Sequence, residues 1–220
     1  MQDYKLKICG LTHQAGVDAA LASGADYLGF MFFPPSPRHL DVAQALPLMQ
    51  RVDGRAQTVA VLVNPKPEQV SELVGAVHPD IIQLHGDETP ALVSALRAVH
   101  PGLIWKAIGI GTAADLAKVD EFESVVDGFL FDAKPPKDAT RPGGLGTAFD
   151  WQILKGYRPV RQTLLAGGLT LENVGKAVEV AGLDGVDVSS SVESAPGNKS
   201  PQLIAEFSSL VRAAAARRAR

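Results

Sequence analysis

Short apolar runs alternate along this chain with longer segments in which apolar residues recur at helical spacing. The short runs are rich in Val, Ile, Leu and Phe and have the length of buried strands. The longer segments, rich in Ala, Leu and Val, have the spacing of helices with one buried face. The pattern predicts strands over residues 4–9, 27–32, 57–63, 80–84, 103–108, 128–132, 163–166 and 185–188.

A helix is predicted after each of these strands. Thr12 can cap the first helix, which Gly24 ends, and Asp41 can cap the second. Pro67 suits a first helical turn, because that turn leaves the amide that proline lacks unpaired in any case. The predicted helices span residues 12–23 and 41–50, start at about 67 and near 89–90, span 112–119, start at about 149, span 171–181 and start at about 201.

This alternation determines the fold class. Strands that are separated by single helices must run parallel, because a hairpin cannot join them, and their crossovers are right-handed. Eight such units within 220 residues predict one (β/α)8 barrel domain over residues 1–220. An open doubly wound sheet is the alternative, but it usually has a Gly-rich dinucleotide turn after its first strand. The turn at Cys9-Gly10-Leu11-Thr12 lacks that pattern, so the barrel is favoured.

Composition limits the partners and the location. The net charge of −3 gives no overall field that favours nucleic acid or an anionic membrane, and arginines near the C-terminus suit the last turn of a helix. The single cysteine excludes an internal disulfide and a multi-cysteine zinc site. No apolar run approaches the roughly 18 residues of a membrane span. We therefore expect a cytoplasmic protein without nucleic-acid or membrane partners.

In a barrel, residues at the carboxyl ends of the strands line the catalytic face, whereas those at the amino ends mostly serve stability. The candidates at carboxyl ends are polar or small residues that would meet at one mouth. They are Cys9, Ser36-Pro37-Arg38, Gln83, His85, Lys106, Asp132, Gly167-Gly168 and Ser189-Ser190-Ser191. Lys106 could instead be an inward structural lysine, and it is left out of the catalytic set.

Two loops have the chemistry of a phosphate site. Gly167-Gly168 follows the seventh strand, and Ser189-Ser190-Ser191 follows the eighth. Adjacent glycines let backbone N–H groups approach an anion closely, and barrels commonly bind phosphate between these two loops. Alternatively, the glycines only make a tight turn and the serines cap helices. The presence of both loops in the right two units favours phosphate.

The pleat of the first strand places Lys5, Lys7 and Cys9 on one side and the apolar Leu6 and Ile8 on the other. The apolar side should face the helices, which directs Lys7 and Cys9 into the barrel. A nearby ammonium favours the thiolate, so Cys9 would be a better base than an isolated thiol. Alternatively, Cys9 is only a small buried hydrophobe.

Lys7 then needs a buried counter-charge. Asp187 is expected to supply it, because the first and last strands are neighbours in a closed barrel. Otherwise Lys7 extends to the barrel floor. Asp132, at the outlet of the sixth strand, could donate a proton or only cap the next loop. That Pro- and Gly-rich loop, residues 133–146 with Lys134, Lys137 and Arg141, predicts a cover for the substrate.

The order of these motifs resembles the phosphoribosylanthranilate isomerase family over almost the whole chain. The matching stretches are KICGLT (7–12), GAD (24–26) with GF (29–30), SPR (36–38), QLHGDE (83–88), FDW (149–151), LAGGL (165–169) with ENV (172–174), and GVDVSS (185–190). The resemblance implies a (β/α)8 enzyme of tryptophan biosynthesis, working without cofactor or metal as a monomer or homodimer. Its reaction is the Amadori rearrangement of N-(5-phosphoribosyl)anthranilate to the carboxyphenylamino-deoxyribulose phosphate.

The resemblance also implies roles for individual residues. Asp132 would be the general acid that protonates the furanose ring oxygen, and Cys9 the general base that removes the C2′ proton. Arg38 would hold the anthranilate carboxylate, and His85 would contact the anthranilate ring or form a hydrogen bond across the barrel top. The phosphate would lie between the loops of Gly167 and Gly168 and of Ser190 and Ser191.

Three stretches depart from the family pattern. Gly143-Gly144-Leu145-Gly146 lacks a threonine hydroxyl, and Ser191 stands where a glycine is usual. A serine there is tolerated only if the backbone does not need a positive φ. Lys134-Pro135-Pro136-Lys137 makes the loop stiffer and more basic than expected.

Other phosphosugar barrels are the main alternative. Indoleglycerol-phosphate synthase would have a catalytic lysine near the first strand end, where this chain has Cys9. Epimerases would show His and Asp metal ligands, whereas His85 stands alone. A histidine-pathway isomerase would need aspartates after strands one and five. A barrel that binds phosphate without turnover is the non-enzymatic alternative.

Overall fold

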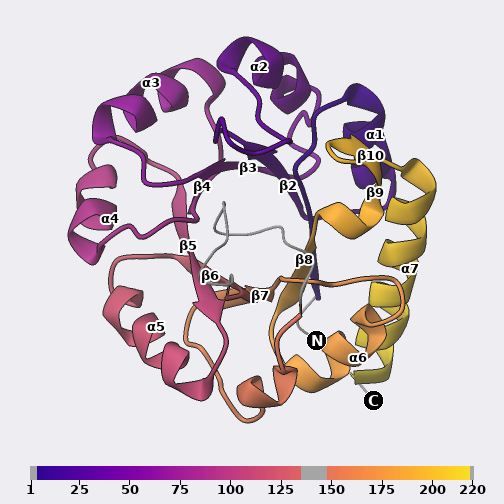
Figure 1. Cartoon of the computed structure of the whole chain (residues 1–220). Coiled ribbons are helices and arrows are strands. Elements are labelled where there is room, and N and C mark those ends of the chain that lie inside the picture. Colours follow the sequence, from indigo (N-terminus) through magenta and orange to yellow (C-terminus); the bar gives the residue numbers. More distant parts are fainter. Residues whose placement is uncertain (1–3, 135–147, 219–220) are drawn as a thin grey trace.

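The computed structural model describes residues 4–134 and 148–218, and it confirms the predicted closed barrel of eight parallel strands. In Figure 1 the strands surround the centre and the helices form an outer ring. Each strand pairs with its sequence neighbours, and β1 pairs with β8 to close the barrel. The strands are β1 (Lys5–Cys9), β2 (Tyr27–Met31), β3 (Gln57–Leu62), β4 (Ile81–Leu84), β5 (Leu103–Ile110), β6 (Gly128–Ala133), β7 (Gln162–Leu165) and β8 (Gly185–Val188).

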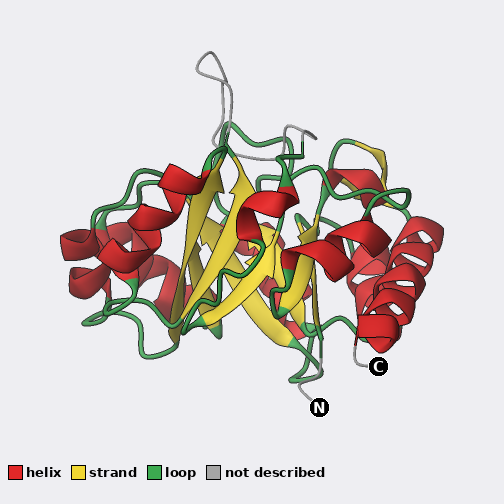
Figure 2. Ribbon diagram, turned by 90° about the horizontal axis from the view of Figure 1, so that it is seen from below, coloured by secondary structure: helices red, strands yellow, loops and turns green. Residues whose placement is uncertain are grey.

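Helices flank the strands on both sides in Figure 2 and bury one apolar face against them. The α-helices are α1 (Gln14–Ala22), α2 (Val42–Gln50), α3 (Pro67–Val77), α4 (Pro90–Leu96), α5 (Ala117–Phe122), α6 (Val174–Ala181) and α7 (Pro201–Arg218). The described residues also form three short 3-10 helices: η1 (Ala113–Leu116), η2 (Trp151–Leu154) and η3 (Ser190–Val192). No helix in the part of the chain that is described has the length and apolarity needed to cross a membrane.

Capping chemistry explains where the helices begin. The predicted cap at Asp41 is confirmed, since its side chain accepts from the Gln44 amide while the Gln44 side chain accepts from the Asp41 amide. Pro67 occupies the first turn of α3, as predicted. The prediction for Thr12 is wrong: His13 is the N-cap of α1, and the Thr12 hydroxyl donates instead to the Gly197 carbonyl.

Two predicted helices are shorter than expected. The helix predicted from residue 149 is only the single turn η2, because Gly156 turns the backbone to a φ of 82° shortly after it. The helix predicted over 171–181 begins at Val174. The segment predicted over 112–119 consists of η1 and then α5. These differences change no strand and leave the barrel order intact.

Alternation along the strands divides the core into two layers. Leu6 and Ile8 belong to the layer between strands and helices, and Cys9 belongs to the layer inside the barrel. The interior is filled by one group of side chains that includes Tyr27, Val59 and Trp105, so the barrel is a packed core. The predicted inward direction of Cys9 is therefore confirmed.

An aspartate stands immediately before each even-numbered strand, at the floor of the barrel, meaning the amino ends of the strands. Each carboxylate accepts a hydrogen bond from a backbone amide of the preceding strand. The four bonds run from Leu6 to Asp26 (2.9 Å), from Thr58 to Asp80 (2.7 Å), from Ile104 to Asp127 (2.8 Å) and from Thr163 to Asp184 (2.8 Å). The floor is thus held by a repeated contact between a side chain and the backbone.

One element has no counterpart in the predictions. After β8 and η3 the chain forms an antiparallel hairpin, β9 (Glu193–Ala195) and β10 (Asn198–Lys199), before α7. Glu193 and Lys199 are register partners in this hairpin. Its turn at Gly197 lies close to the Pro37 carbonyl. The hairpin therefore lies beside the loop that follows β2.

Candidate active site

A pocket opens at the mouth of the barrel, meaning the carboxyl ends of the eight strands. Most of the predicted site residues line it, although they come from six different strand ends. Its lining includes Cys9, Arg38, Gln83, His85, Asp132, Gly167, Gly168, Asp187, Ser189 and Ser190. The sequence therefore identified the face and most of its polar side chains.

Cys9 ends β1, buried at the bottom of this pocket. Gly29 on the neighbouring strand makes room for the thiol, since a Cβ there would lie 2.7 Å from the Cys9 sulfur. Burial raises the pKa of the Cys9 thiol, and the adjacent Lys7 only partly opposes this. The expectation that Lys7 would favour the thiolate over that of an isolated thiol is therefore wrong, because desolvation of the anion outweighs the ammonium.

Lys7 lies fully buried inside the barrel and forms the predicted ion pair with Asp187. The two residues are register partners on β1 and β8, and their charged atoms lie 3.0 Å apart. Burial opposes the charge on Lys7, but Asp187 and Cys9 together raise its pKa above the usual value. Lys7 therefore stays an ammonium, placed between a carboxylate and the thiol.

Asp132 lies near the end of β6 with both carboxyl oxygens in use. Oδ1 accepts from the Ala133 amide at 2.8 Å, and Oδ2 lies 3.1 Å from Nε2 of His85. The other ring nitrogen of His85 lies 3.1 Å from the Gln83 side-chain amide. Of the two roles predicted for His85, the hydrogen bond across the barrel top is thus present. The amide nitrogen of Gln83 can only donate, so Nδ1 of His85 accepts and its protonated Nε2 donates to the Asp132 carboxylate.

The turn after β7 approaches Asp132 very closely. Gly167 has a φ of 82° and Gly168 a φ of 61°. A Cβ at Gly167 would lie 2.4 Å from the Ala133 nitrogen and 2.7 Å from Oδ1 of Asp132. Only glycine fits both the backbone angle and this space. The glycine pair therefore brings the backbone of this loop against the acid.

The two predicted phosphate loops lie side by side at the pocket. Gly168 and Ser190 both line it, and their amides have no acceptor within the described part of the chain. Ser191 is placed differently, because its hydroxyl donates to the Leu169 carbonyl at 2.5 Å and thus ties one loop to the other. Its φ is not positive, so the serine that replaces the usual glycine is accommodated.

Arg38 lines the pocket from the loop after β2, but its guanidinium is already engaged. Its Nε and Nη2 atoms each donate to Glu193, both at 2.7 Å. The predictions included no partner for Arg38. The only signal in the sequence for such a partner was the acidic Glu193, two residues beyond Ser191 in the loop after β8. Sequence alone did not show that the hairpin would turn Glu193 toward Arg38.

Lys106 lies outside the site. Its neighbours Trp105 and Ala107 point into the barrel, so Lys106 points outward, where it forms a buried 3.0 Å ion pair with Glu88. The alternative of an inward structural lysine is therefore wrong in direction. Glu88 also accepts from the Asn64 and Gly86 amides, which fixes the loop that bears His85.

The start of the predicted cover loop is anchored. Lys134 donates to Asp115 at 2.6 Å, and Asp115 accepts from the Gly111 and Thr112 amides. Residues 135–147, with Lys137, Arg141 and Gly143-Gly144-Leu145-Gly146, lie outside the described residues, so the expectations for them stay predictions. Among the residues described, no group of three or more His, Cys, Asp and Glu side chains could hold a metal ion.

Comparison with known proteins identifies a family. The model of the family described as N-(5'phosphoribosyl)anthranilate (PRA) isomerase matches residues 6–209. A protein of that name from Nitrobacter hamburgensis is 49% identical over 209 residues, which cover 95% of this chain and 93% of the relative. One from Azorhizobium caulinodans is 49% identical over 212 residues, covering 96% and 93%.

Solved structures agree with this match. Phosphoribosyl anthranilate isomerase from Thermotoga maritima has a TM-score of 0.86 and 32% identity, covering 96% of this chain and 100% of its own. Another structure of such an enzyme, in complex with reduced 1-(o-carboxyphenylamino)-1-deoxyribulose 5-phosphate, has a TM-score of 0.83 and 30% identity, with the same coverage. The resemblance inferred from the motifs is therefore confirmed.

Proposed function

This chain belongs to the N-(5'-phosphoribosyl)anthranilate isomerase family, and from this premise we propose how its own residues perform the reaction. The family makes it an isomerase of tryptophan biosynthesis, acting on N-(5'-phosphoribosyl)anthranilate. The observation that carries the residue assignments is that Cys9, Asp132 and Arg38 line one pocket. The glycine loop after β7 and the serine loop after β8 line the same pocket. An acid, a base and two anion sites thus face the same space.

Asp132 is the general acid. It donates a proton to the furanose ring oxygen as the ring opens, which leaves an iminium between the anthranilate nitrogen and C1′. His85 supports the carboxylate that the transfer leaves, because Gln83 donates to Nδ1 and the protonated Nε2 donates to Oδ2 of Asp132. Gly167, which allows the close approach of backbone to Asp132, keeps this side of the pocket in place.

Cys9 is the general base. As a thiolate it removes the C2′ proton, and the electron pair of that bond forms the enolamine, which tautomerises to the ketone. One proton enters the substrate from Asp132 and one leaves to Cys9, so its proton count before tautomerisation is unchanged. Burial disfavours the thiolate, and the Lys7 ammonium, held by Asp187, partly offsets this cost.

The two ends of the substrate are anions, and the pocket has a site for each. Arg38 binds the anthranilate carboxylate, and amides near Gly167, Gly168 and Ser190 bind the phosphate. Ser191 supports this site by tying the two loops together. Holding both ends keeps C1′ and C2′ aligned with the acid and the base, which contributes to the rate in addition to proton transfer.

A spectroscopic assay of phosphoribosylanthranilate turnover tests these roles. We expect Cys9→Ser and Asp132→Asn each to lower kcat by about 10²–10⁴-fold, because each removes one proton-transfer group. Asp18→Asn, which changes an exposed carboxylate paired with Arg51, is the control and should keep the wild-type rate. A near-normal rate in either active-site variant contradicts its assignment, and a wild-type protein without turnover contradicts the proposal as a whole.

Three expectations stay predictions. The chain should fold as one domain, act as a monomer or a homodimer, and lie in the cytoplasm. One similar structure is described as monomers generated from the dimeric enzyme of Thermotoga maritima. Analytical ultracentrifugation of this chain distinguishes the two states directly.

A further inference from the structure

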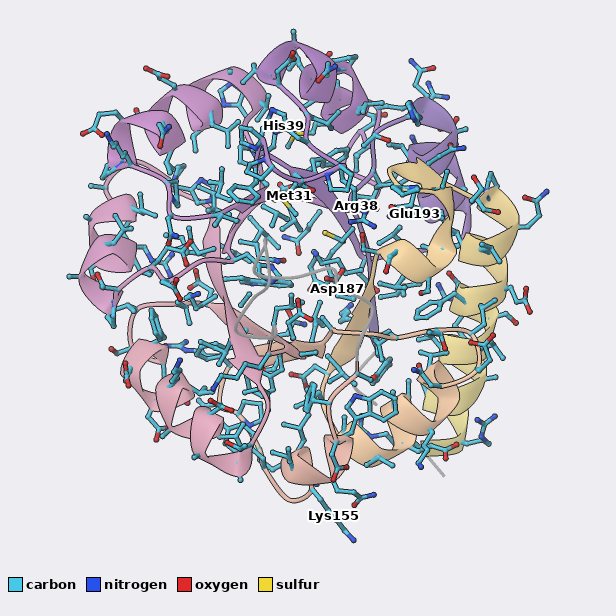
Figure 3. All side chains as sticks on the ribbon, viewed as in Figure 1. Met31, Arg38, His39, Lys155, Asp187 and Glu193 are labelled. Carbon is cyan, nitrogen blue, oxygen red and sulfur yellow. The ribbon has the colours of Figure 1, made fainter. Side chains whose placement is uncertain are left out.

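We propose that Glu193 is a positioning residue that fixes which edge of the Arg38 guanidinium faces the pocket, and so sets the selectivity for a substrate with an aryl carboxylate. This inference rests on the proposed role of Arg38. It goes beyond that role because it assigns carboxylate selectivity to a residue of the β9–β10 hairpin, outside the pocket lining. Figure 3 shows Arg38 and Glu193 next to each other at the rim of the barrel.

The contact between the Arg38 and Glu193 side chains is bidentate. Nε and Nη2 of Arg38 donate to the two different oxygens of Glu193, both at 2.7 Å, and both side chains are buried. A guanidinium offers five N–H donors in one plane, and a two-point contact fixes that plane. Nη1 has no acceptor among the described residues, which leaves the Nη1–Nη2 edge for a ligand carboxylate.

Lys199 is a second cation that holds Glu193. Its buried ammonium donates to Oε1 of Glu193 at 2.7 Å and to the Ser189 carbonyl at 3.0 Å. Burial alone would raise the pKa of Glu193, but the bonds from Arg38 and Lys199 lower it below its usual range. Glu193 therefore stays ionised, and it connects the carboxylate end of the pocket with the serine loop of the phosphate end.

The stem of Arg38 is confined as well. A Cβ at Gly10 would lie 2.4 Å from Cδ of Arg38 and 3.1 Å from the Ser189 hydroxyl, so the stem passes directly over this glycine. With the stem confined over Gly10 and the head held by Glu193, Arg38 loses little conformational freedom when a carboxylate binds. Such preorganisation strengthens binding without any new contact.

The test compares two substrates that differ only in the carboxylate. N-(5-phosphoribosyl)anthranilate and N-(5-phosphoribosyl)aniline are assayed with the wild-type protein and with Glu193→Gln. Glutamine keeps the shape of glutamate but removes its charge and one of its two acceptors. We expect kcat/KM for the anthranilate to fall about 10- to 100-fold, mainly through KM, and kcat/KM for the aniline to change less than about threefold.

Three further variants make the result decisive. Asp18→Asn breaks an exposed fork to Arg51 with bonds of 2.6 and 2.7 Å, and it should leave the ratio of the two kcat/KM values unchanged. Glu193→Asp keeps the charge on a shorter stem and should restore part of the ratio. Arg38→Met should abolish it.

The outcomes separate the two proposals. If Arg38→Met keeps the wild-type ratio, the proposed role of Arg38 fails. If Arg38→Met loses the ratio but Glu193→Gln keeps it, the inference about Glu193 fails alone. An equal fall for both substrates in Glu193→Gln and Glu193→Asp, with a lower unfolding midpoint, shows a purely structural residue and also overturns the inference.

Discussion

Asp127 and Asp132 stand at opposite ends of β6 and differ in what holds them. Asp127, at the floor, accepts from the Ile104 amide and from Arg97. Asp132, at the mouth, accepts from one amide and contacts His85, and it lines the pocket. The floor carboxylate is bonded to backbone and to an arginine, whereas the mouth carboxylate faces a titratable ring and open space.

The same contrast holds around the barrel. All four floor aspartates fix a neighbouring strand through its backbone, at 2.7–2.9 Å. At the mouth, polar side chains contact other side chains, as in Arg38 with Glu193 and Asp132 with His85. Asp132 also accepts from a backbone amide, so its contact with the titratable ring of His85 and its place in the pocket lining distinguish it from the floor aspartates.

The largest effect is expected from one substitution made at both ends of β6. Asp132→Asn should lower kcat by about 10²–10⁴-fold and change the free energy of unfolding by less than about 1 kcal/mol. Asp127→Asn should keep kcat and lower the free energy of unfolding by about 1–3 kcal/mol, because a buried amide and Arg97 lose a charged acceptor. Steady-state kinetics and urea denaturation measure both, and the opposite pattern would refute the division between floor and mouth.

Lys7, between the two ends, should affect both properties. Lys7→Met leaves Asp187 buried without a cation, which should cost about 3–5 kcal/mol in the free energy of unfolding. Burial raises the pKa of Asp187 even beside Lys7, and loss of the ammonium should raise this pKa further above the unfolded value. Stability is then lost as pH rises, and the deficit should be larger at pH 8 than at pH 5.

The double variant Lys7→Met with Asp187→Leu should recover much of that stability, since it removes the unpaired charge. It should not recover kcat, because Cys9 still lacks the ammonium. Urea denaturation at both pH values and kinetics provide the measurements. If the stability deficit of Lys7→Met relative to the wild type is equal at pH 5 and pH 8, the account of Asp187 is contradicted.

Two glycines with the same backbone angle allow the effect of backbone strain to be measured separately from the effect of contact with Asp132. Gly156 and Gly167 both have a φ of 82°, but only Gly167 has neighbours within 4 Å of a built Cβ. Alanine at either should cost about 1–2 kcal/mol from the backbone angle. Only Gly167→Ala should lower kcat, by at least about tenfold, because its methyl group displaces Asp132. Equal kcat in the two variants would show that the close approach is unimportant.

The smallest effect is expected at Asp115, which lies on the mouth side but is bonded like a floor aspartate. Burial opposes its charge, but hydrogen bonds from Lys134 and the Thr112 and Gly111 amides lower its pKa. Asp115→Asn should cost about 0.5–1.5 kcal/mol with kcat unchanged. The difference should be constant at neutral pH and shrink only below about pH 4, where the unfolded carboxyl takes up a proton.

Urea denaturation of Asp115→Asn and the wild type from pH 7 to pH 3 provides that measurement. If Asp115→Asn lowers kcat strongly while stability is unchanged, then the role of a carboxylate is determined by its location at the mouth. Its hydrogen-bond partners would then not determine that role. The comparison between floor and mouth would then need revision.

Periodicity was sufficient to predict the barrel, because each strand is a short apolar run and each helix has one apolar face. It also predicted the Lys7–Asp187 pair, since closure makes β1 and β8 neighbours. It missed the β9–β10 hairpin, which has only five strand residues and no alternating pattern. It therefore missed Glu193 and Lys199 as well. The acidity of Cys9 was predicted wrongly because a sequence shows which charges are near but not how deeply a thiol is buried.

The closure of the barrel has a consequence for synthesis on the ribosome. Lys7 and its counter-charge Asp187 are 180 residues apart, and Lys7 is fully buried only once β8 has docked against β1. At a translation rate of about 5–20 residues per second, β8 is made roughly 10–40 seconds after β1. During that interval, burial of the Lys7 ammonium is unfavourable, because the Asp187 carboxylate has not yet been made. The nascent chain should therefore stay open along this seam until β8 has been made.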